Sequence, residues 1–133
     1  MPLLLLISDL YLVGVGLTVA LVVYPSFHLV GAGQWIQFHR AHVRRITYVV
    51  GVAWVAQGVG SLWWLLRGPD RGVGEIHAVV ALAAVVLTLV KAVPIHQRLE
   101  RHCDSHDIRQ LQRWHLWRTL AWTICALTTL RLI

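Results

Sequence analysis

The chain has 133 residues, of which 57% are apolar and only 14% are charged, and its formal net charge is +6 at pH 7. A soluble domain carries about 25% charged residues, so this composition argues against a soluble globular protein. The basic excess does not indicate a nucleic-acid partner, because basic residues flank long apolar runs. In membrane proteins such residues set the topology and contact anionic lipid headgroups. We therefore expect an integral membrane protein.

Four apolar runs have about the length, roughly 20 residues, that crosses the hydrocarbon core of a bilayer. Backbone polar groups in lipid must be satisfied within the segment, so each run predicts a helix. Short connections join them into one domain, an all-α, up-down-up-down four-helix bundle whose helices two to four extend past the membrane surface. The predicted spans cover residues 3–24, 46–66, 76–93 and 116–133.

The first run contains Asp9 and has neither a basic start nor a small-residue cleavage site, so we expect a retained helix rather than a signal peptide. Its Gly14 and Thr18 form a small-x-x-x-small pair, which is typical of closely packed membrane helices. Asp9 lies at the level of His77 in the third run, and we expect a structural ion pair between them.

The second helix is predicted to begin at about Gln34, because "WIQFHRAHVRRI" has helical periodicity. Small residues on one stripe mark the face that packs against other membrane helices. We therefore expect His39 and His42 to face the bundle. The full stripe is His39, His42, Ile46, Val49, Ala53, Ala56, Gly60 and Trp63. Trp63 and Trp64 are expected to form an aromatic belt at the opposite membrane interface.

On the third helix the predicted stripe is His77, Ala81, Ala84, Thr88 and Lys91, followed by His96 in "VPIHQRLE". Lys91 either extends to lipid headgroups or faces inward, where it would position an anionic substrate. The fourth helix carries the stripe Leu111, His115, Arg118, Trp122, Cys125 and Thr129. Trp122 is most simply part of an aromatic belt with Trp114 and Trp117. His102 and His106 are expected to be solvated.

Charge is distributed unevenly between the two ends of the predicted bundle. The side that holds the connections 25–45 and 94–115 has nine of the twelve basic residues, a net charge of +6 and seven of the eight histidines. The other side has a net charge of zero. Positive residues concentrate on the cytoplasmic side of bacterial inner and plasma membranes. We therefore expect the histidine-rich face in the cytoplasm and both termini outside.

The inward histidines are the candidate ligands of a metal: His39, His42, His96 and His115, which His28 could join. Such a set is compatible with copper, zinc, non-haem iron or axial haem ligation. Alternatively, a quinone or phenol binds without a metal, a neutral histidine accepts a proton, and Arg118 or Lys91 stabilises a phenolate. The simplest alternative is that these histidines only hydrogen-bond helix ends and water.

Short motifs resemble a family over nearly the whole chain. "YPSF", "FHRAHVRRI", "VPIHQRL" and D-x-x-x-L-x-x-x-H-x-x-R-T-x-x-W-T are similar to the anthrone-oxygenase-like group of small four-helix membrane proteins. The resemblance implies a four-helix bundle and oxygenation of a polycyclic phenolic substrate. The family more often has Asn at the position of His115. The matching positions are His39, His42, Arg45, His96, His115, Arg118 and Trp122.

We therefore expect a membrane oxidoreductase, of the monooxygenase type, that acts on a hydrophobic phenolic or quinone-like substrate at the cytoplasmic interface. Its candidate catalytic residues are Arg118, Lys91 and Trp122. Copper is the preferred cofactor over iron or haem, and a site without any cofactor is also compatible with the sequence. A haem- or quinone-binding protein and a non-enzymatic accessory subunit remain alternatives, and homo-oligomerisation is left open.

Overall fold

A computed structural model describes residues 1–133, and every regular element in it is a helix. The chain forms four helical arms. The first arm comprises α1 (Pro2–Thr18), the π-helical turn η1 (Val19–Val23), α2 (Tyr24–Ser26) and the 3-10 turn η2 (Phe27–Leu29). The second arm is α3 (Trp35–Arg67). The third comprises α4 (Arg71–Leu87), the π-helical turn η3 (Thr88–Ala92) and α5 (Val93–Leu99), and the fourth comprises α6 (Ser105–Thr129) and the 3-10 turn η4 (Leu130–Leu132).

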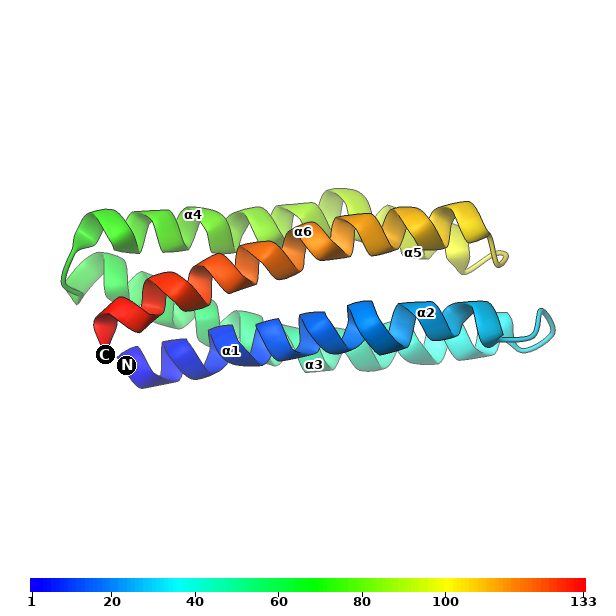
Figure 1. Ribbon diagram of the computed structural model, residues 1–133, viewed down its shortest axis with the longest axis horizontal. Helices are drawn as coiled ribbons and strands as arrows, with labels where there is room; N and C mark the ends of the chain where they lie inside the picture. Colours follow the sequence, from blue (N-terminus) through cyan, green and yellow to red (C-terminus); the bar gives the residue numbers. More distant parts are fainter.

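The four arms lie side by side along the long axis of the molecule (Figure 1). Both chain termini lie at the end where α3 connects to α4, and the other two connections lie at the opposite end. We call the latter the histidine end. Both α3 and α6 pack against α1 and α4, so the arms enclose a common core. Its larger buried cluster, which includes Phe27, Trp35 and Leu111, lies toward the histidine end.

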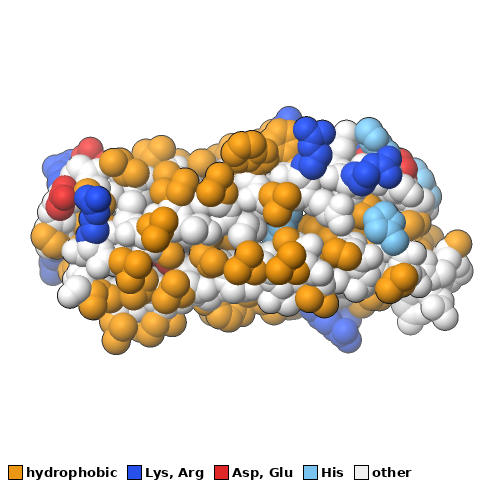
Figure 2. Space-filling view, viewed as in Figure 1, with side chains coloured by type: hydrophobic (Ala, Val, Ile, Leu, Met, Phe, Trp, Pro, Cys, Tyr) orange, Lys and Arg blue, Asp and Glu red, His pale blue; other side chains and the backbone are white.

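Three arms are long and apolar enough to cross a membrane: Pro2–Leu29, Trp35–Arg67 and Arg71–Leu99. The fourth is not among them, because α6 is polar over its first turns and carries Arg118 in its apolar part. Hydrophobic side chains cover the middle of the molecule on the face drawn in Figure 2, and charged side chains gather toward both ends. This pattern is consistent with a membrane protein.

Each π-helical turn is followed by a proline, Pro25 or Pro94, at the second residue of the next α-helix. Proline has no N–H, and its ring collides with the carbonyl four residues earlier in an α-helix, so a wider turn accommodates it. In η3 the extra residue rotates the side chains that follow. The buried residue is therefore Ala92, and Lys91 is exposed. The predicted stripe is confirmed at His77, Ala81 and Ala84 but wrong at Lys91.

The predicted packing face of α6 is confirmed along its whole length. All six members are buried: Leu111, His115, Arg118, Trp122, Cys125 and Thr129. On α3 the prediction is correct for His39, Ala53 and Gly60, but Val49 and Ala56 are exposed and Trp63 is partly exposed. Gln57 and Trp64, the residues that follow Ala56 and Trp63, are buried instead. Trp64 is therefore a core residue rather than part of an aromatic belt, and its Nε1 donates a hydrogen bond to the Pro69 carbonyl at 2.7 Å.

Two glycines allow the arms to approach closely. A Cβ added to Gly16 would lie 2.7 Å from Thr119 Oγ1, and one added to Gly60 would lie 2.7 Å from Leu5 Cδ1. The predicted contact at Gly14 is wrong, because Gly14 is exposed and a Cβ there would meet nothing within 4 Å. The close contact between α1 and α6 is therefore made at Gly16, two residues after Gly14 and on a different face of the helix.

Candidate substrate site at the histidine end

Three imidazole rings from two arms meet at the histidine end. His39 and His42 project from α3, and His96 projects from α5. The ring centroid of His96 lies 5.2 Å from that of His39 and 6.1 Å from that of His42. The His39 ring stacks on Trp35 and has no exposed surface. These positions confirm that His39 faces the bundle, where its neighbour on α5 is His96.

His39 and His96 form a hydrogen bond between His39 Nε2 and His96 Nδ1, at 3.0 Å. One of these nitrogens must carry a hydrogen and the other must be deprotonated, so both rings cannot be fully protonated at once. When His96 Nδ1 is the donor, His96 Nε2 is a free acceptor. That nitrogen makes no hydrogen bond within the protein.

Arg118 fixes the tautomer of His115. Its guanidinium donates to His115 Nδ1 at 2.6 Å, so Nδ1 must be an acceptor. The hydrogen of the neutral ring is then on Nε2, which donates to the Gly16 carbonyl at 2.8 Å. Both nitrogens of His115 are used, so this histidine holds Arg118 in place and has no lone pair left for a ligand.

Arg118 is itself almost buried inside the bundle. It donates a hydrogen bond to Thr88 Oγ1 at 3.0 Å, and its guanidinium lies 5.8 Å from the centroid of the Trp122 ring. The Tyr24 ring packs edge-on against His115 at 5.1 Å. No carboxylate pairs with Arg118. The site therefore presents an unneutralised positive charge, which favours an anionic or electron-rich oxygen.

A cavity of about 440 Å³ adjoins these residues. Its apolar walls come from α1 and η1, from α3, and from η3 and α5, and they include Val15, Ile46 and Leu89. Four polar residues of the lining are linked to one another around Arg118: Tyr24, Thr88, His115 and Arg118 itself. The other polar residues of the lining are His96, Thr47, Gln97 and Glu100. The space is of the size and character that fits a small apolar ligand with a few polar atoms.

Three residues that line this cavity have buried nitrogens without a hydrogen-bond partner: Trp54 Nε1, Arg118 Nε and Trp122 Nε1. All three are N–H donors. Buried polar groups are nearly always satisfied, so each unpartnered group in a folded protein needs an explanation. An acceptor oxygen on a bound molecule would provide one.

Four of the predicted site residues do not line this cavity: His28, His39, His42 and Lys91. His28 is exposed on η2, beyond the aromatic cluster of Tyr24 and Phe27. Lys91 is also exposed, and its Nζ lies 5.0 Å from the centroid of the Trp114 ring, on the outer side of η3. Trp122 is buried and lines the cavity, so it does not belong to an aromatic belt.

The predicted imidazole set does not form a metal-ligand group in this structure. No three side chains among His, Cys, Asp and Glu are arranged to hold a metal ion. His39 and His96 use one nitrogen each for their mutual hydrogen bond, and His115 uses both of its nitrogens. Copper binding by His39, His42, His96, His115 and His28 remains a prediction.

A second buried polar network lies toward the other end of the bundle. Asp9 accepts hydrogen bonds from Gln57 Nε2 at 2.7 Å, from His77 Nε2 at 3.1 Å and from Thr129 Oγ1 at 2.6 Å. Ser61 Oγ lies 3.2 Å from His77 Nδ1. The predicted Asp9–His77 pair is confirmed. The other three partners were not predicted, although Gln57 is the most polar residue in its apolar stretch of the sequence.

The sequence reasoning also missed Tyr24, Trp54 and Thr88 as residues of the site. Tyr24 directly follows the π-helical turn η1, and Thr88 is the first residue of η3, so both lie at π-helical turns. Such turns occur often at functional sites, and a proline at the end of an apolar run is the signal that could have indicated them.

Comparisons with protein-family models, with curated proteins and with solved structures found no match to this chain.

Proposed function

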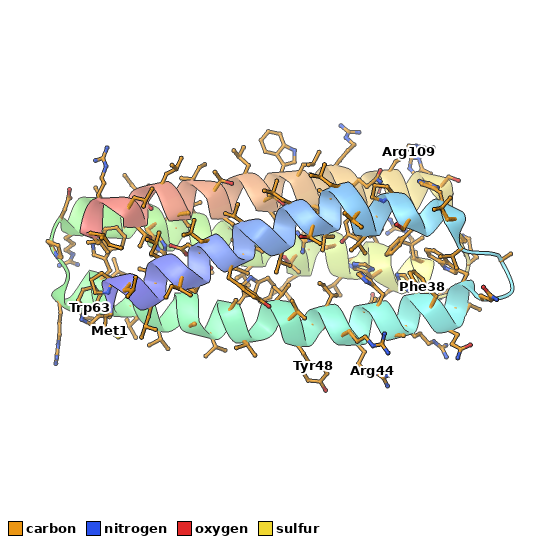
Figure 3. The ribbon with its side chains drawn as sticks, turned by 60° about the horizontal axis from the view of Figure 1, so that its bottom comes forward. Met1, Phe38, Arg44, Tyr48, Trp63 and Arg109 are labelled. Atoms are coloured by element: carbon orange, nitrogen blue, oxygen red, sulfur yellow. The ribbon has the colours of Figure 1, made fainter.

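We propose that the protein is an integral membrane protein whose four arms cross the bilayer in up-down-up-down order. Both termini lie outside, and the histidine end lies at the cytoplasmic surface. Support comes from the three long apolar arms, from the apolar middle of the molecule and from the net charge of +6 at the histidine end. Arg44 projects away from the bundle on the side of α3 toward this end, as interfacial residues do, and Tyr48 projects outward closer to the middle of α3 (Figure 3).

We further propose that the cavity binds a hydrophobic phenolic or quinone-like molecule. The observation that carries this proposal is a largely apolar cavity lined by Arg118, a buried cation that is held by Thr88 and His115 and has no carboxylate partner. The ring system of the ligand would lie against the apolar walls. Its oxygen would accept hydrogen bonds from Arg118 and from the indole N–H groups of Trp54 and Trp122.

The proposed reaction is oxygenation of an anthrone-type substrate by molecular oxygen. His96 Nε2 removes a proton from the ring methylene, and Arg118 stabilises the resulting enolate oxygen. Dioxygen then supplies one oxygen atom to that carbon, and the other leaves as water. The carbon loses four electrons and dioxygen gains four, so CH₂ and O₂ give C=O and H₂O without a further reductant.

His39 supports His96 in its role as the general base. When His96 Nε2 accepts a proton, its Nδ1–H becomes a charge-assisted donor to His39 Nε2, which stabilises the imidazolium. His115 does not touch the substrate in this scheme. It acts as a positioning residue that holds the guanidinium of Arg118 through Nδ1.

The proposal is tested by turnover of a dihydroxyanthrone by purified protein in nanodiscs, followed by oxygen uptake and by the absorbance of the anthraquinone product, above the rate without protein. We expect His96→Ala to lower the rate roughly 100- to 10,000-fold, the usual contribution of a general base. His28→Ala is the matched control, because His28 is exposed at the same end. Equal rates for both variants would contradict the assignment, and binding without turnover would favour the quinone-binding alternative.

A further inference from the structure

A second hollow, separate from the substrate cavity, lies on the outside of the histidine end. It has a volume of about 420 Å³ and lies between α6 and the segment formed by η3 and α5. We call it the basic groove. Its lining includes three cations and two indole rings: Lys91, Arg98, Arg113, Trp114 and Trp117. None of these residues lines the substrate cavity.

One of the three cations is neutralised within the protein. Arg98 donates three hydrogen bonds to Asp107, at 2.7, 3.0 and 3.1 Å. These bonds hold the pKa of the Asp107 carboxyl below its usual range, so the carboxylate stays ionised at neutral pH. Lys91 and Arg113 form no ion pair. The groove therefore keeps two unneutralised positive charges, and Lys91 is held over the Trp114 ring.

The surface next to the groove is apolar in one direction only. Toward the middle of the bundle, Val90, Trp117 and Leu120 are 59%, 59% and 48% exposed. Toward the histidine end the neighbouring side chains are polar, among them Arg109, which is labelled near that end in Figure 3. A ligand that fits both parts has a negatively charged head and apolar chains that run along the bundle.

We propose that the basic groove binds the phosphodiester headgroup of an anionic phospholipid. Lys91 and Arg113 contact the phosphate, Trp114 and Trp117 lie at the level of the glycerol backbone, and the acyl chains cover Val90 and Leu120. Basic pockets between membrane helices on the cytoplasmic side bind such headgroups. This inference rests on the membrane orientation proposed above. It gives Lys91 a role in lipid binding rather than in catalysis.

Lipid binding would also join two elements that carry the substrate site. The groove lies between α5, which holds His96, and α6, which holds His115 and Arg118. A bound headgroup would bridge Lys91 on the third arm and Arg113 on the fourth. We therefore expect occupancy of the groove to raise the thermal stability of this end of the bundle.

The experiment measures binding of phosphatidylglycerol to detergent-purified protein by native mass spectrometry and by the shift in unfolding temperature. The test variant is Lys91→Gln/Arg113→Gln, and the control is Arg44→Gln/Arg45→Gln, which removes the same charge from the exposed side of α3. Each basic residue contributes about 1 kcal/mol to the attraction of anionic lipid, so we expect binding to the test variant to be roughly 10- to 30-fold weaker. The control should bind like the natural protein.

Three results would overturn the proposal. Equal weakening in both variants would indicate a general attraction between charges rather than a site. An equal shift in unfolding temperature with inorganic phosphate at the same concentration would indicate a phosphate site. Equal binding of phosphatidylcholine would show that the groove does not distinguish anionic from zwitterionic lipids. Substrate turnover in detergent uses the other cavity, so a failure of lipid binding is distinguishable from a failure of the proposed activity.

Discussion

At the residue scale, the two buried polar networks differ in how completely they are satisfied. Every oxygen of Asp9 is hydrogen-bonded, and none of its side chain is exposed. The network around Arg118 instead leaves its Nε and the indole N–H groups of Trp54 and Trp122 unpartnered. A fully satisfied network is typical of a structural role, whereas unpartnered buried donors require a further partner, which a ligand in the adjoining cavity would supply.

The structural role of Asp9 leads to a stability prediction. Asp9→Ala removes the shared acceptor and leaves His77, Gln57 and Thr129 buried without it, which should destabilise the fold by about 3–5 kcal/mol. Thermal unfolding in detergent measures the loss. The control is Glu75→Gln, since the Arg71–Glu75 pair is exposed and such pairs contribute less than about 1 kcal/mol. Similar unfolding temperatures for the two variants would rule out the proposed structural role.

At the element scale, the contact between α1 and α6 depends on the absence of a side chain at Gly16. Gly16→Ala would place a methyl group 2.7 Å from Thr119 Oγ1, and overpacking of this kind costs about 1–3 kcal/mol. Gly14→Ala on the open face should instead be neutral or stabilising by up to about 1 kcal/mol, because alanine favours the helix. The unfolding temperature should therefore fall for Gly16→Ala and stay the same or rise for Gly14→Ala.

A second substitution identifies the cause of the Gly16 effect. Thr119→Ala removes the two nearest atoms, Oγ1 and Cγ2, so the double variant should recover most of the stability lost in Gly16→Ala. If the two losses simply add, the contact between these residues is not the reason for the loss.

The packing faces of the helices were predictable from sequence where the helix is regular. The stripe on α6 is correct at every position because this helix has no proline and keeps its period from Leu111 to Thr129. On the third arm the prediction fails at Lys91, where η3 inserts an extra residue. On α3 it slips from Ala56 to Gln57 because lipid-facing and inward residues are both apolar there, so the pattern has little contrast.

The sequence was sufficient to predict which residues come together at the candidate site, but not how they are hydrogen-bonded. Helical spacing brought His39, His96, His115 and Arg118 to one end, and the structure places all four near one another. Which nitrogen of His115 carries the hydrogen depends on distances below 3 Å to Arg118 and Gly16. The contact with Gly16 joins two arms that are far apart in the chain, and no periodicity encodes it.

At the scale of the whole molecule, the proposed orientation can be tested with a natural label. Cys103 is exposed in the connection at the histidine end, and Cys125 is buried in the core. A membrane-impermeant maleimide should therefore label Cys103 only after the cells are opened. Burial and the nearby Asp104 carboxylate raise the pKa of the Cys103 thiol, so labelling should accelerate as the pH rises above neutral.

The control for orientation is a cysteine at the other end of the bundle. Arg71→Cys in a Cys103→Ser background places an exposed thiol next to the α3–α4 turn, and it should react in intact cells. The reverse pattern of labelling would mean that the histidine end faces outward.

The central claim is that the cavity binds an apolar molecule through an oxygen that faces Arg118. The most direct measurement is a titration of purified protein with a hydroxyanthraquinone, followed by quenching of tryptophan fluorescence, because Trp54 and Trp122 line the cavity. We predict saturable quenching, with binding roughly 10-fold or more weaker for Arg118→Gln, as expected for loss of a charge-assisted hydrogen bond, and partial rescue in Arg118→Lys. Quenching that does not saturate, or that is the same in folded Arg118→Gln protein, would contradict the claim.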